Sequence, residues 1–358
     1  MKVFFGAGNI ISPLGNSLQE NWNNILNYHS EIKPYKPLLG EEKVCLSKFT
    51  AEKPLFEHIK ASIDGTLNQV TGLDLSETLL ILSTTKGDIQ QLENNDCEAA
   101  LLDTLCEKIA KNYEFSNHIT VSNACVSGIS ALIMAHDFVK TNKYKNVLVV
   151  AADACTSFVI EGFKTFFALS ASVCQPYDLN RSGINLGEAV GSALVTSNES
   201  YFLEKPIKIL GGASANDANH ISGPSRTGEG LYRAIKKTLK QGNCHVQEID
   251  HINAHGTATR YNDDMESMAF DRLEMNEIPT NSLKGYFGHT LGAAGLIESL
   301  IALKELQENL IVGTVGFEEL GTIKPIAISA KHIEKSLNRV LKTGSGFGGC
   351  NAAILFEK

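Results

Sequence analysis

Cys125 stands in a run of small and polar residues, Ser122-Asn123-Ala124-Cys125-Val126-Ser127-Gly128, between an extended segment and an apolar helix. The extended segment covers residues 118–121, and the helical pattern continues to about Val139 with few polar positions. A helix that is apolar on nearly all sides belongs in the protein interior. At its first turn a thiol faces unpaired N–H groups and the positive end of the helix dipole, which favour the thiolate. Cys125 is therefore predicted to be an activated nucleophile.

Three further segments place reactive side chains beside glycines at predicted junctions of strand and loop. They are Asn253-Ala254-His255-Gly256-Thr257-Ala258-Thr259, the stretch 281–295 that contains Lys284 and His289, and Gly344-Ser345-Gly346-Phe347-Gly348-Gly349-Cys350-Asn351. Glycine allows positive φ and close approach to a ligand, and catalytic residues favour loops on a rigid scaffold. Singly, each segment has an ordinary explanation: a histidine satisfied in the core, a tight turn, or a buried cysteine acting as a small hydrophobe. Their combination and order indicate a shared site.

Together, the four segments resemble those of the β-ketoacyl–acyl-carrier-protein synthases, the condensing enzymes of the thiolase-like superfamily. The likeness extends from Ser12-Pro13-Leu14-Gly15 to Gly346-Phe347-Gly348-Gly349, and thus over almost the whole chain. The His255-Gly256-Thr257 and Gly288-His289-Thr290-Leu291-Gly292 segments are its most specific parts. The related synthases that start chains from acyl-CoA carry asparagine instead of the second histidine, so His289 implies the elongating branch.

The resemblance implies a role for each catalytic residue. Cys125 would accept an acyl group from a thioester and hold it covalently, which divides one difficult reaction into two easier steps. The backbone N–H groups of Cys125 and Phe347 would form the oxyanion hole, and the Phe347 ring would act as a gate. His255 and His289 would donate hydrogen bonds to the malonyl thioester carbonyl and stabilise the enolate left when CO₂ departs. That role needs an N–H and no positive charge on the rings.

Supporting and binding residues are also implied by the resemblance. Lys284 would support His289 and the local charge balance. Glu298 corresponds to a buried acidic residue, which we expect to pair with Lys284 or a bound cation because an isolated buried carboxylate is costly. Four residues are assigned to the pantetheine channel and substrate: His220, Thr257, Thr259 and Gly348. Turn packing is the alternative explanation for the two threonines.

Alternating strand and helix patterns predict an α/β protein made of two similar halves, 1–200 with the nucleophile and 201–358 with the catalytic histidines and lysine. The resemblance implies a thiolase-like fold with five layers, α-β-α-β-α. A long apolar helix is predicted over 293–306. Strands are predicted at 77–83, 118–121, 146–152, 191–196, 207–211, 251–253, 280–282, 326–329, 339–343 and 352–356. The resemblance further implies a homodimer in which strand 146–152 pairs with its twin.

Composition narrows the function classes. The 358 residues have a formal net charge of -8 spread along the chain, which gives no electrostatic case for binding nucleic acid. The implied partner, an acyl carrier protein, is acidic, so this negatively charged chain would need a local basic patch to bind it. The eight cysteines lack disulfide or metal spacing, no cleavable apolar leader is seen, and no run of about 18 apolar residues suggests a membrane span. These features favour a cytoplasmic setting, and the condensation that the resemblance implies needs neither metal nor cofactor.

Three other functions stay open. The chain between about Tyr35 and Ile119 is shorter than in typical elongating synthases, Arg260 replaces a common proline, and Ser345 replaces a common aromatic residue. These departures are compatible with a specialised ketosynthase of polyketide or aryl-polyene assembly. A non-catalytic partner subunit of a ketosynthase heterodimer would typically lack Cys125. A thiolase would need a second catalytic cysteine, and Cys350 lies in the right region but where the family usually has threonine.

Overall fold

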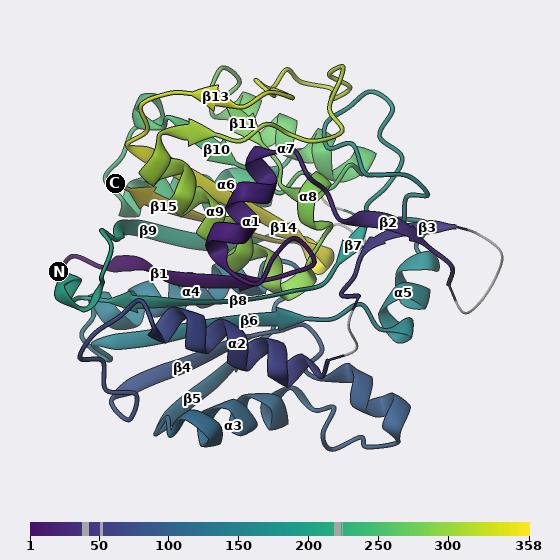
Figure 1. Cartoon of the computed structure of the whole chain (residues 1–358). Coiled ribbons are helices and arrows are strands. Elements are labelled where there is room, and N and C mark those ends of the chain that lie inside the picture. Colours follow the sequence, from purple (N-terminus) through teal and green to yellow (C-terminus); the bar gives the residue numbers. More distant parts are fainter. Residues whose placement is uncertain (38–42, 51–52, 218–222, 224) are drawn as a thin grey trace.

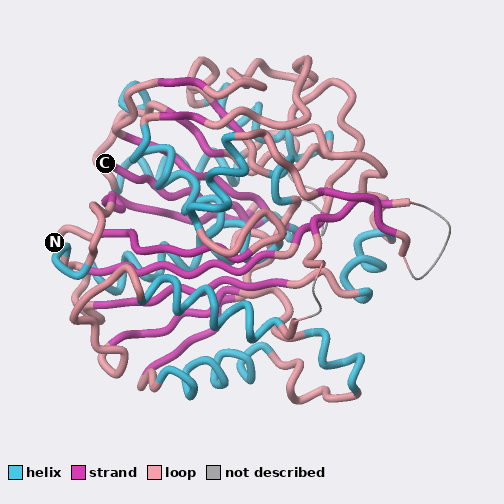
Figure 2. Tube along the Cα trace, viewed as in Figure 1, coloured by secondary structure: helices cyan, strands magenta, loops and turns pink. Residues whose placement is uncertain are grey.

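The computed structural model describes residues 1–37, 43–50, 53–217, 223 and 225–358. Ten strands lie side by side in the order β11-β10-β14-β15-β9-β1-β8-β6-β4-β5 (Figures 1 and 2). The strands of the first half are β1 (Phe4–Ile11), β4 (Thr78–Ser83), β5 (Asn117–Val121), β6 (Asn146–Asp153) and β8 (Ala189–Thr196). Those of the second half are β9 (Ile207–Asn216), β10 (His251–Asn253), β11 (Thr280–Asn281), β14 (Arg339–Gly346) and β15 (Cys350–Glu357).

The two halves repeat one topology. If the five strands of each half are numbered along the chain, they lie across the sheet in the order first, fifth, fourth, second, third. The pairings also match, because two antiparallel pairs are followed by two parallel pairs in β1-β8-β6-β4-β5 and in β9-β15-β14-β10-β11. The halves join where Phe4 and Phe5 of β1 pair with Lys208 and Ile207 of β9.

Helices complete five layers. Helices α2 (Leu55–Leu67) and α3 (Leu102–Tyr113) pack on one face of the first half, and α6 (Glu229–Gln241) and α7 (Arg260–Arg272) pack on one face of the second. Helices α4 (Ser127–Lys140) and α9 (Ala294–Glu308) lie between the halves. Alternation along β4 shows the layering, since Leu79 and Ile81 face α4 and α9 while Leu80 and Leu82 face α2 and α3. The predicted thiolase-like α/β fold is confirmed.

Two glycines let the central helices approach closely. A Cβ on Gly128 of α4 would lie 2.6 Å from the backbone N of Leu296 in α9. A Cβ on Gly295 would lie 2.3 Å from the backbone N of Ile129. The amino-terminal ends of α4 and α9 are therefore held together, which brings the segments that precede them, with Cys125 and His289, to one place.

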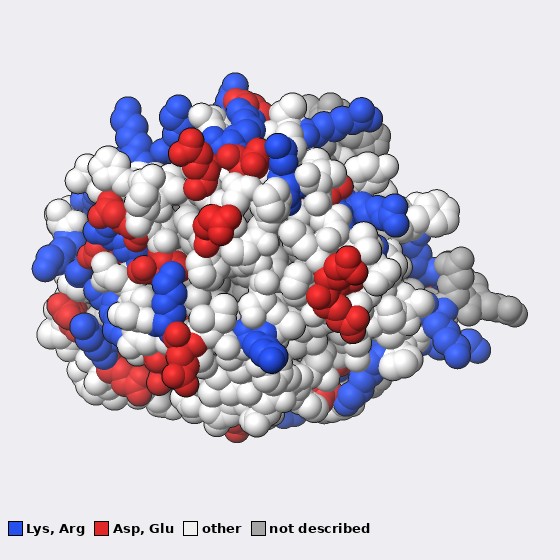
Figure 3. Space-filling view, turned by 90° about the horizontal axis from the view of Figure 1, so that it is seen from above, with Lys and Arg blue, Asp and Glu red and all other residues white. Residues whose placement is uncertain are grey.

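Smaller elements surround this framework. They are α1 (Leu18–Leu26), α5 (Ser157–Lys164), α8 (Lys284–Phe287), the small sheet of β2 (Ile32–Tyr35), β3 (Val44–Ser47) and β7 (Leu186–Gly187), the pair β12 (Leu310–Ile311) and β13 (Ile333–Glu334), and 3-10 turns at Ile89–Asn94, Glu199–Tyr201, Val246–Glu248, Leu291–Ala293 and Phe347–Gly349. Across the described residues, every helix is too short or too polar to cross a membrane. On the face shown in Figure 3, acidic and basic side chains are interspersed.

Two strand predictions were wrong. The segment 326–329 forms only an isolated bridge between Ile328 and Thr280, not a strand. Strand β6, predicted to pair with its twin across a two-fold axis, hydrogen-bonds to β4 on one side and to β8 on the other. It therefore has no free backbone edge for a second copy. The edge strand of the first half is β5, which directly precedes Cys125.

Candidate active site

Cys125 lies in a strained turn between β5 and α4. The preceding residue, Ala124, has φ +44°, a left-handed conformation that is uncommon for a residue other than glycine. Ser127 fixes the turn: its hydroxyl accepts from the N–H of Asn123 at 2.7 Å and donates to the carbonyl of Ala124 at 2.6 Å. Cys125 thus stands two residues before α4 and not in its first turn, where it was predicted, and it lines a cavity of about 990 Å³.

Burial changes the predicted ionisation of this thiol. Desolvation raises the pKa of Cys125 to about 11, although the positive charges of Lys284 and Lys86 oppose the shift. The expectation of a thiolate favoured by the helix end was therefore wrong for the resting protein. The thiol is the dominant form at neutral pH, and its proton has to leave when the sulfur attacks.

Both predicted histidines reach the same cavity. The thiol of Cys125 and the nearest ring nitrogens of His255 and His289 all lie within 4.8 Å of one another. The two rings are nearly perpendicular, at 84°, with centroids 5.2 Å apart. Within the part of the chain that the structure describes, neither ring nitrogen of His289 has a hydrogen-bond partner. A buried imidazole without a partner is unusual, so these nitrogens are available to a ligand.

The histidines are neutral at physiological pH. Burial, and next the charge of Lys284, hold the pKa of both His255 and His289 well below its usual value. The Lys284 ammonium lies 3.5 Å from Nδ1 of His255. An ammonium can only donate, so Nδ1 accepts and the ring carries its proton on Nε2. Each ring can then offer one N–H to an oxygen in the cavity.

A buried group of three charges lies behind the histidines. Lys284 contacts one oxygen of Glu298 at 2.5 Å, and Lys342 contacts the other at 2.6 Å. Burial raises the pKa of Glu298, but the two ammonium groups outweigh it, so the pKa lies below its usual value. The expected pairing of Glu298 with Lys284 is present. Lys284 hydrogen-bonds to the ring and the carbonyl oxygen of His255, and it acts on His289 through its charge, which helps to lower the pKa of that ring. Its predicted support of His289 stays a prediction.

Carboxylates hold the opposite side of the His255 loop. Glu266 accepts the backbone N–H of His255 at 2.9 Å and that of Gly256 at 2.8 Å. Asp263 accepts the N–H of Thr257 at 3.0 Å, and burial followed by the charge of Glu266 raises its pKa to about 7. Gly256 has φ +43°, which glycine adopts most easily. The loop is thus fixed by its backbone, which leaves the ring of His255 free to face the cavity.

The Phe347 segment closes the cavity beside Cys125. The Phe347 ring stacks on Phe163 at 5.7 Å and meets Phe166 edge-on at 5.4 Å. The backbone N–H of Phe347 points to the sulfur of Cys125 and lowers its pKa. A Cβ on Gly346 would lie 3.1 Å from the backbone N of Cys125, so the two backbone segments meet there. The placement of Phe347 beside Cys125 is compatible with the predicted oxyanion hole and gate.

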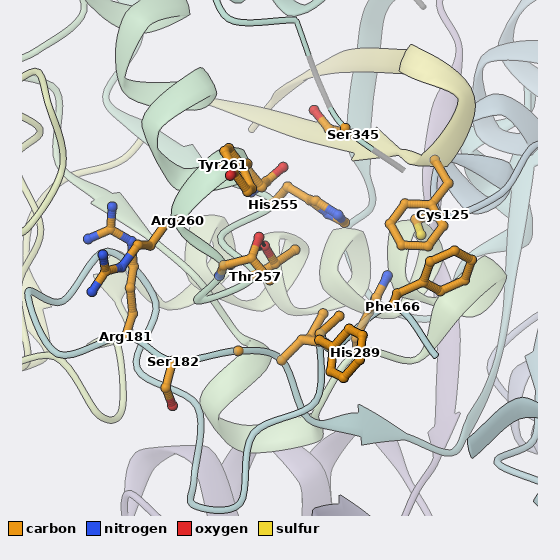
Figure 4. A pocket seen from close by; sticks show the side chains of 18 of the residues that line it. Cys125, Phe166, Arg181, Ser182, His255, Thr257, Arg260, Tyr261, His289 and Ser345 are labelled. Atoms are coloured by element: carbon orange, nitrogen blue, oxygen red, sulfur yellow. Dashed lines mark hydrogen bonds between the residues drawn. The ribbon is translucent and has the colours of Figure 1, made fainter. Parts of the chain in front are cut away.

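The cavity extends from Cys125 to a basic rim (Figure 4). Figure 4 shows Cys125 and Phe166 at one end and Arg181 and Arg260 at the other. Arg181 is buried and paired with Asp264 at 2.8 Å, whereas Arg260 is exposed. Arg226, also exposed, lines the cavity as well.

The predicted binding residues have different positions. Thr257 and Thr259 line the cavity and hydrogen-bond to each other at 2.8 Å. Gly348, with φ +80°, is not among the described residues that line it. His220 falls outside the described residues. Their assignment to substrate binding stays a prediction.

The sequence interpretation missed residues of this site, among them three charged residues that hold the His255 segment. Asp263 and Glu266 are three residues apart on one face of a helix that follows the His255 loop, a spacing that could have suggested a shared role. Lys342 stands in the strand segment Val340-Leu341-Lys342-Thr343, where it resembles an ordinary strand residue.

The donor atoms also allow a metal ion. A thiol and two imidazoles are common ligands of Zn²⁺, and these three lie close enough to share one ion after small adjustments. Buried positive charges on Lys284 and Lys342 disfavour a divalent cation at the same place.

Comparison with known proteins identifies the family. Residues 207–318 match the family model described as the C-terminal domain of beta-ketoacyl synthase, and residues 119–204 match that of 3-oxoacyl-[acyl-carrier-protein] synthase III. The second match includes Cys125 but not His289. Among solved structures, a ketosynthase in complex with its chain length factor from Xenorhabdus doucetiae has a TM-score of 0.86 and 22% identity over 99% of this chain and 98% of that one. The ishigamide ketosynthase/chain length factor has a TM-score of 0.87 and 24% identity over 100% and 99%.

Sequence relatives agree. A ketoacyl synthase alpha subunit of the tetracenomycin polyketide synthase from Streptomyces glaucescens is 28% identical over 71% of this chain and 63% of its own. A protein from Schizosaccharomyces pombe, named as a mitochondrial 3-oxoacyl-[acyl-carrier-protein] synthase, is 30% identical over 99% of this chain and 98% of its own. With this similarity over both full lengths, and with a cysteine and two histidines around one cavity, the chain belongs to the β-ketoacyl-acyl-carrier-protein synthase family of condensing enzymes.

Proposed function

We propose that this chain condenses an acyl group on Cys125 with a malonyl thioester of an acyl carrier protein, in fatty-acid or related biosynthesis. The observation that carries the proposal is the pair of neutral, buried histidines facing Cys125, with both nitrogens of His289 lacking a partner among the described residues. These groups can stabilise an oxyanion without being charged themselves. The family membership supports an acyltransferase that forms carbon–carbon bonds.

Acyl transfer is the first step. The sulfur of Cys125 attacks the carbonyl carbon of the incoming thioester, and the tetrahedral oxyanion is held by the N–H groups of Cys125 and Phe347. Collapse breaks the bond to the carrier sulfur. The carrier thiol leaves with the proton that Cys125 gives up, so charge is conserved. Release of this proton during attack fits the raised pKa of Cys125.

Decarboxylation and condensation follow. The bond between the malonyl carboxylate and the adjacent carbon breaks, CO₂ leaves, and the electron pair forms an enolate on the thioester. The N–H groups of His255 and His289 stabilise its oxygen. The enolate carbon then attacks the acyl group on Cys125, and the sulfur leaves as a thiolate that takes up a proton. Burial favours this protonation, because the pKa of the thiol is raised.

An acyl carrier protein is the proposed partner. One structural relative is described as an acyl-carrier protein in complex with its ketosynthase. The exposed Arg226 and Arg260 at the rim of the cavity supply the basic surface that the net charge of -8 made necessary. The Phe167 side chain, which is 91% exposed and also lines the cavity, adds apolar contact area.

We further propose a homodimer that forms through β5. Its outer edge has no strand partner in the described residues, and the sheet could continue there into a second copy. A heterodimer with a chain length factor is the alternative, since two structural relatives are described as such complexes. Light scattering of the purified chain at micromolar concentration distinguishes the two: a monomer would contradict the homodimer.

The division into two domains, the cellular location and the pathway are further parts of the proposal. The domain boundary near residue 200 is supported by the repeated strand order of the two halves. The relatives do not agree on a cytoplasmic location, because one of them is named as mitochondrial. The elongating branch rests on His289, and a specialised polyketide or aryl-polyene pathway stays compatible with the same site.

The half-reactions test the proposed function separately. Intact mass spectrometry after incubation with acyl-carrier proteins of several chain lengths should give an acyl adduct that Cys125→Ala lacks. Failure to form an adduct with any acyl donor would rule out an enzyme and favour a non-catalytic partner subunit. His289→Ala should still accept acyl groups but release little CO₂ from malonyl carrier. Normal CO₂ release by this variant would contradict the role of His289.

A further inference from the structure

Lys342 is the most deeply buried cation whose position the reaction does not explain. Its side chain is 1% exposed, and its ammonium is surrounded by oxygen atoms. These are the Glu298 carboxylate at 2.6 Å, the carbonyl of Thr343 at 2.7 Å, and the carbonyls of Asn253 and Ala254 at 3.3 Å each. Three carbonyls and one carboxylate form the kind of oxygen shell that also binds a monovalent metal ion or free ammonium.

Stability alone gives a poor reason for this lysine. Burying a charge is expensive, and replacing a buried ion pair by apolar residues is commonly neutral or stabilising. Here one carboxylate, Glu298, serves two lysines, so the group carries a net positive charge in the interior. Desolvation also lowers the pKa of Lys342, which measures the cost of keeping it charged.

The contacts of Lys342 converge on the end of β10. Its ammonium binds the carbonyls of Asn253 and Ala254, and Lys284 binds the next carbonyl, that of His255, at 2.9 Å. Glu266 accepts the N–H groups on the other side of the same backbone. Successive peptide units leading into His255 are therefore held between cations and a carboxylate. A small shift of this segment would move the His255 ring directly.

We propose that Lys342 is a positioning residue that provides a built-in monovalent cation for the active site. It fixes the backbone leading to His255 and keeps a positive charge behind the two histidines as the enolate forms. This inference rests on the proposed condensation and deepens it. It also requires that the oxygen shell accept a free cation when the lysine side chain is removed.

Chemical rescue tests the proposal. Lys342→Ala opens the oxygen shell, whereas Lys342→Met removes the charge but fills the space. We expect both variants to release CO₂ from malonyl carrier about 100-fold more slowly than the parent chain, because a small misplacement of a catalytic group can cost about that factor. Ammonium or potassium chloride should restore much of the rate in Lys342→Ala only. Tetramethylammonium chloride, used to keep ionic strength constant, is too large to enter.

A matched control separates this role from packing. Lys304→Ala removes another buried lysine, paired with Glu308 at 3.1 Å on helix α9, away from the cavity. Its CO₂ release should match the parent rate and should not respond to the cation. Full CO₂ release by Lys342→Ala without added cation, or a loss that neither ammonium nor potassium reverses, would overturn the proposal.

Thermal unfolding gives a readout without catalysis. The melting temperature of Lys342→Ala should rise when ammonium or potassium replaces tetramethylammonium, because an ion that binds only the folded state stabilises it. The parent chain and Lys342→Met should not respond. If the parent chain formed no condensation product but Lys342→Ala still showed this stabilisation, the proposed function would fail and the cation shell would stand. If Lys342→Ala does not fold in either salt, full CO₂ release by Lys342→Met is the overturning result.

Discussion

The contact between Gly128 and α9 makes the site sensitive to a single methyl group. A Cβ at position 128 would lie 2.6 Å from the backbone N of Leu296 and 3.0 Å from Gly295, whereas ordinary contacts begin at 3.4 Å. The atoms that it meets belong to the backbone and cannot rotate away. In Gly128→Ala, α4 and α9 must therefore separate by about 1 Å, a displacement that can cost about 100-fold in rate when it reaches reacting groups.

The displacement is transmitted to the chemistry by short segments. Cys125 lies three residues before Gly128, and His289 lies six residues before Gly295. Overpacking of a well-filled core costs about 1–3 kcal/mol, against which alanine regains up to about 1 kcal/mol of helix propensity over glycine. We therefore expect a folded variant with reduced stability and condensation that is slower by about 100-fold. Acylation of Cys125 should fall less, because it does not require His289 at a fixed distance.

A second helical glycine provides the control. A Cβ on Gly162 of α5 would meet no atom within 4 Å, so Gly162→Ala makes the same chemical change in open space. Product formation from acyl and malonyl carrier proteins, measured beside acyl-adduct formation by mass spectrometry, compares the two variants. Gly162→Ala should keep both activities. If Gly128→Ala condensed at the parent rate, the close helix contact would not be what aligns Cys125 and His289.

The remaining predictions concern charge and ligands. With the pKa of Cys125 raised to about 11, its alkylation by iodoacetamide should accelerate about tenfold per pH unit from pH 7 to 10, and a plateau near pH 8 would argue for a thiolate. His255 and His289 stay neutral in the folded state, whereas in the unfolded chain they bind protons below about pH 6.5. Each histidine therefore lowers the free energy of unfolding by about 1.4 kcal/mol for every pH unit below that value. Thermal scans should show a shallower loss of stability for His289→Asn, and a loss equal to that of the parent chain would refute the assignment. Glu266→Gln should lower the free energy of unfolding by about 1.5–3 kcal/mol, because it weakens hydrogen bonds to a charged group. It should also slow CO₂ release more than acylation of Cys125, and equal slowing of both steps would contradict this role. Dialysis against a chelator should leave condensation unchanged, whereas a loss restored by Zn²⁺ would show that Cys125 and the histidines bind metal.

Each candidate catalytic position breaks a local sequence pattern, but only the four segments together, through the family resemblance, gave these positions their expected roles. Cys125 interrupts a strand-to-helix junction, and His255 and His289 are set among glycines that need unusual backbone angles. Such local signals do not depend on the partners of each strand. The order of the strands does depend on them: the resemblance placed the pairing edge at β6, whereas the edge strand of the first half is β5. Parallel strands that follow one another along the chain need not lie in chain order across the sheet.

Electrostatics was the other source of error. The sequence places Cys125 at a helix start, which favours a thiolate, but only the structure shows that desolvation outweighs the nearby positive charges and raises the pKa of the thiol. Lys342 was missed for a related reason. A lysine in a strand commonly points to solvent, and only the packing of β14 between β10 and β15, with layers on both faces, turns this one inward.

The repeated topology explains why one site can hold both half-reactions. In each half, the third strand leads into a central helix, β5 into α4 and β11 into α9. The first of these connections carries Cys125, and the second carries Lys284 and His289. Because α4 and α9 touch at Gly128 and Gly295, the two equivalent connections meet, although they have different residues. Under the proposed function, the duplicated framework places the acyl-holding group on one copy and an enolate-stabilising histidine on the other. Any change that separates the copies should uncouple the two half-reactions before it abolishes either of them.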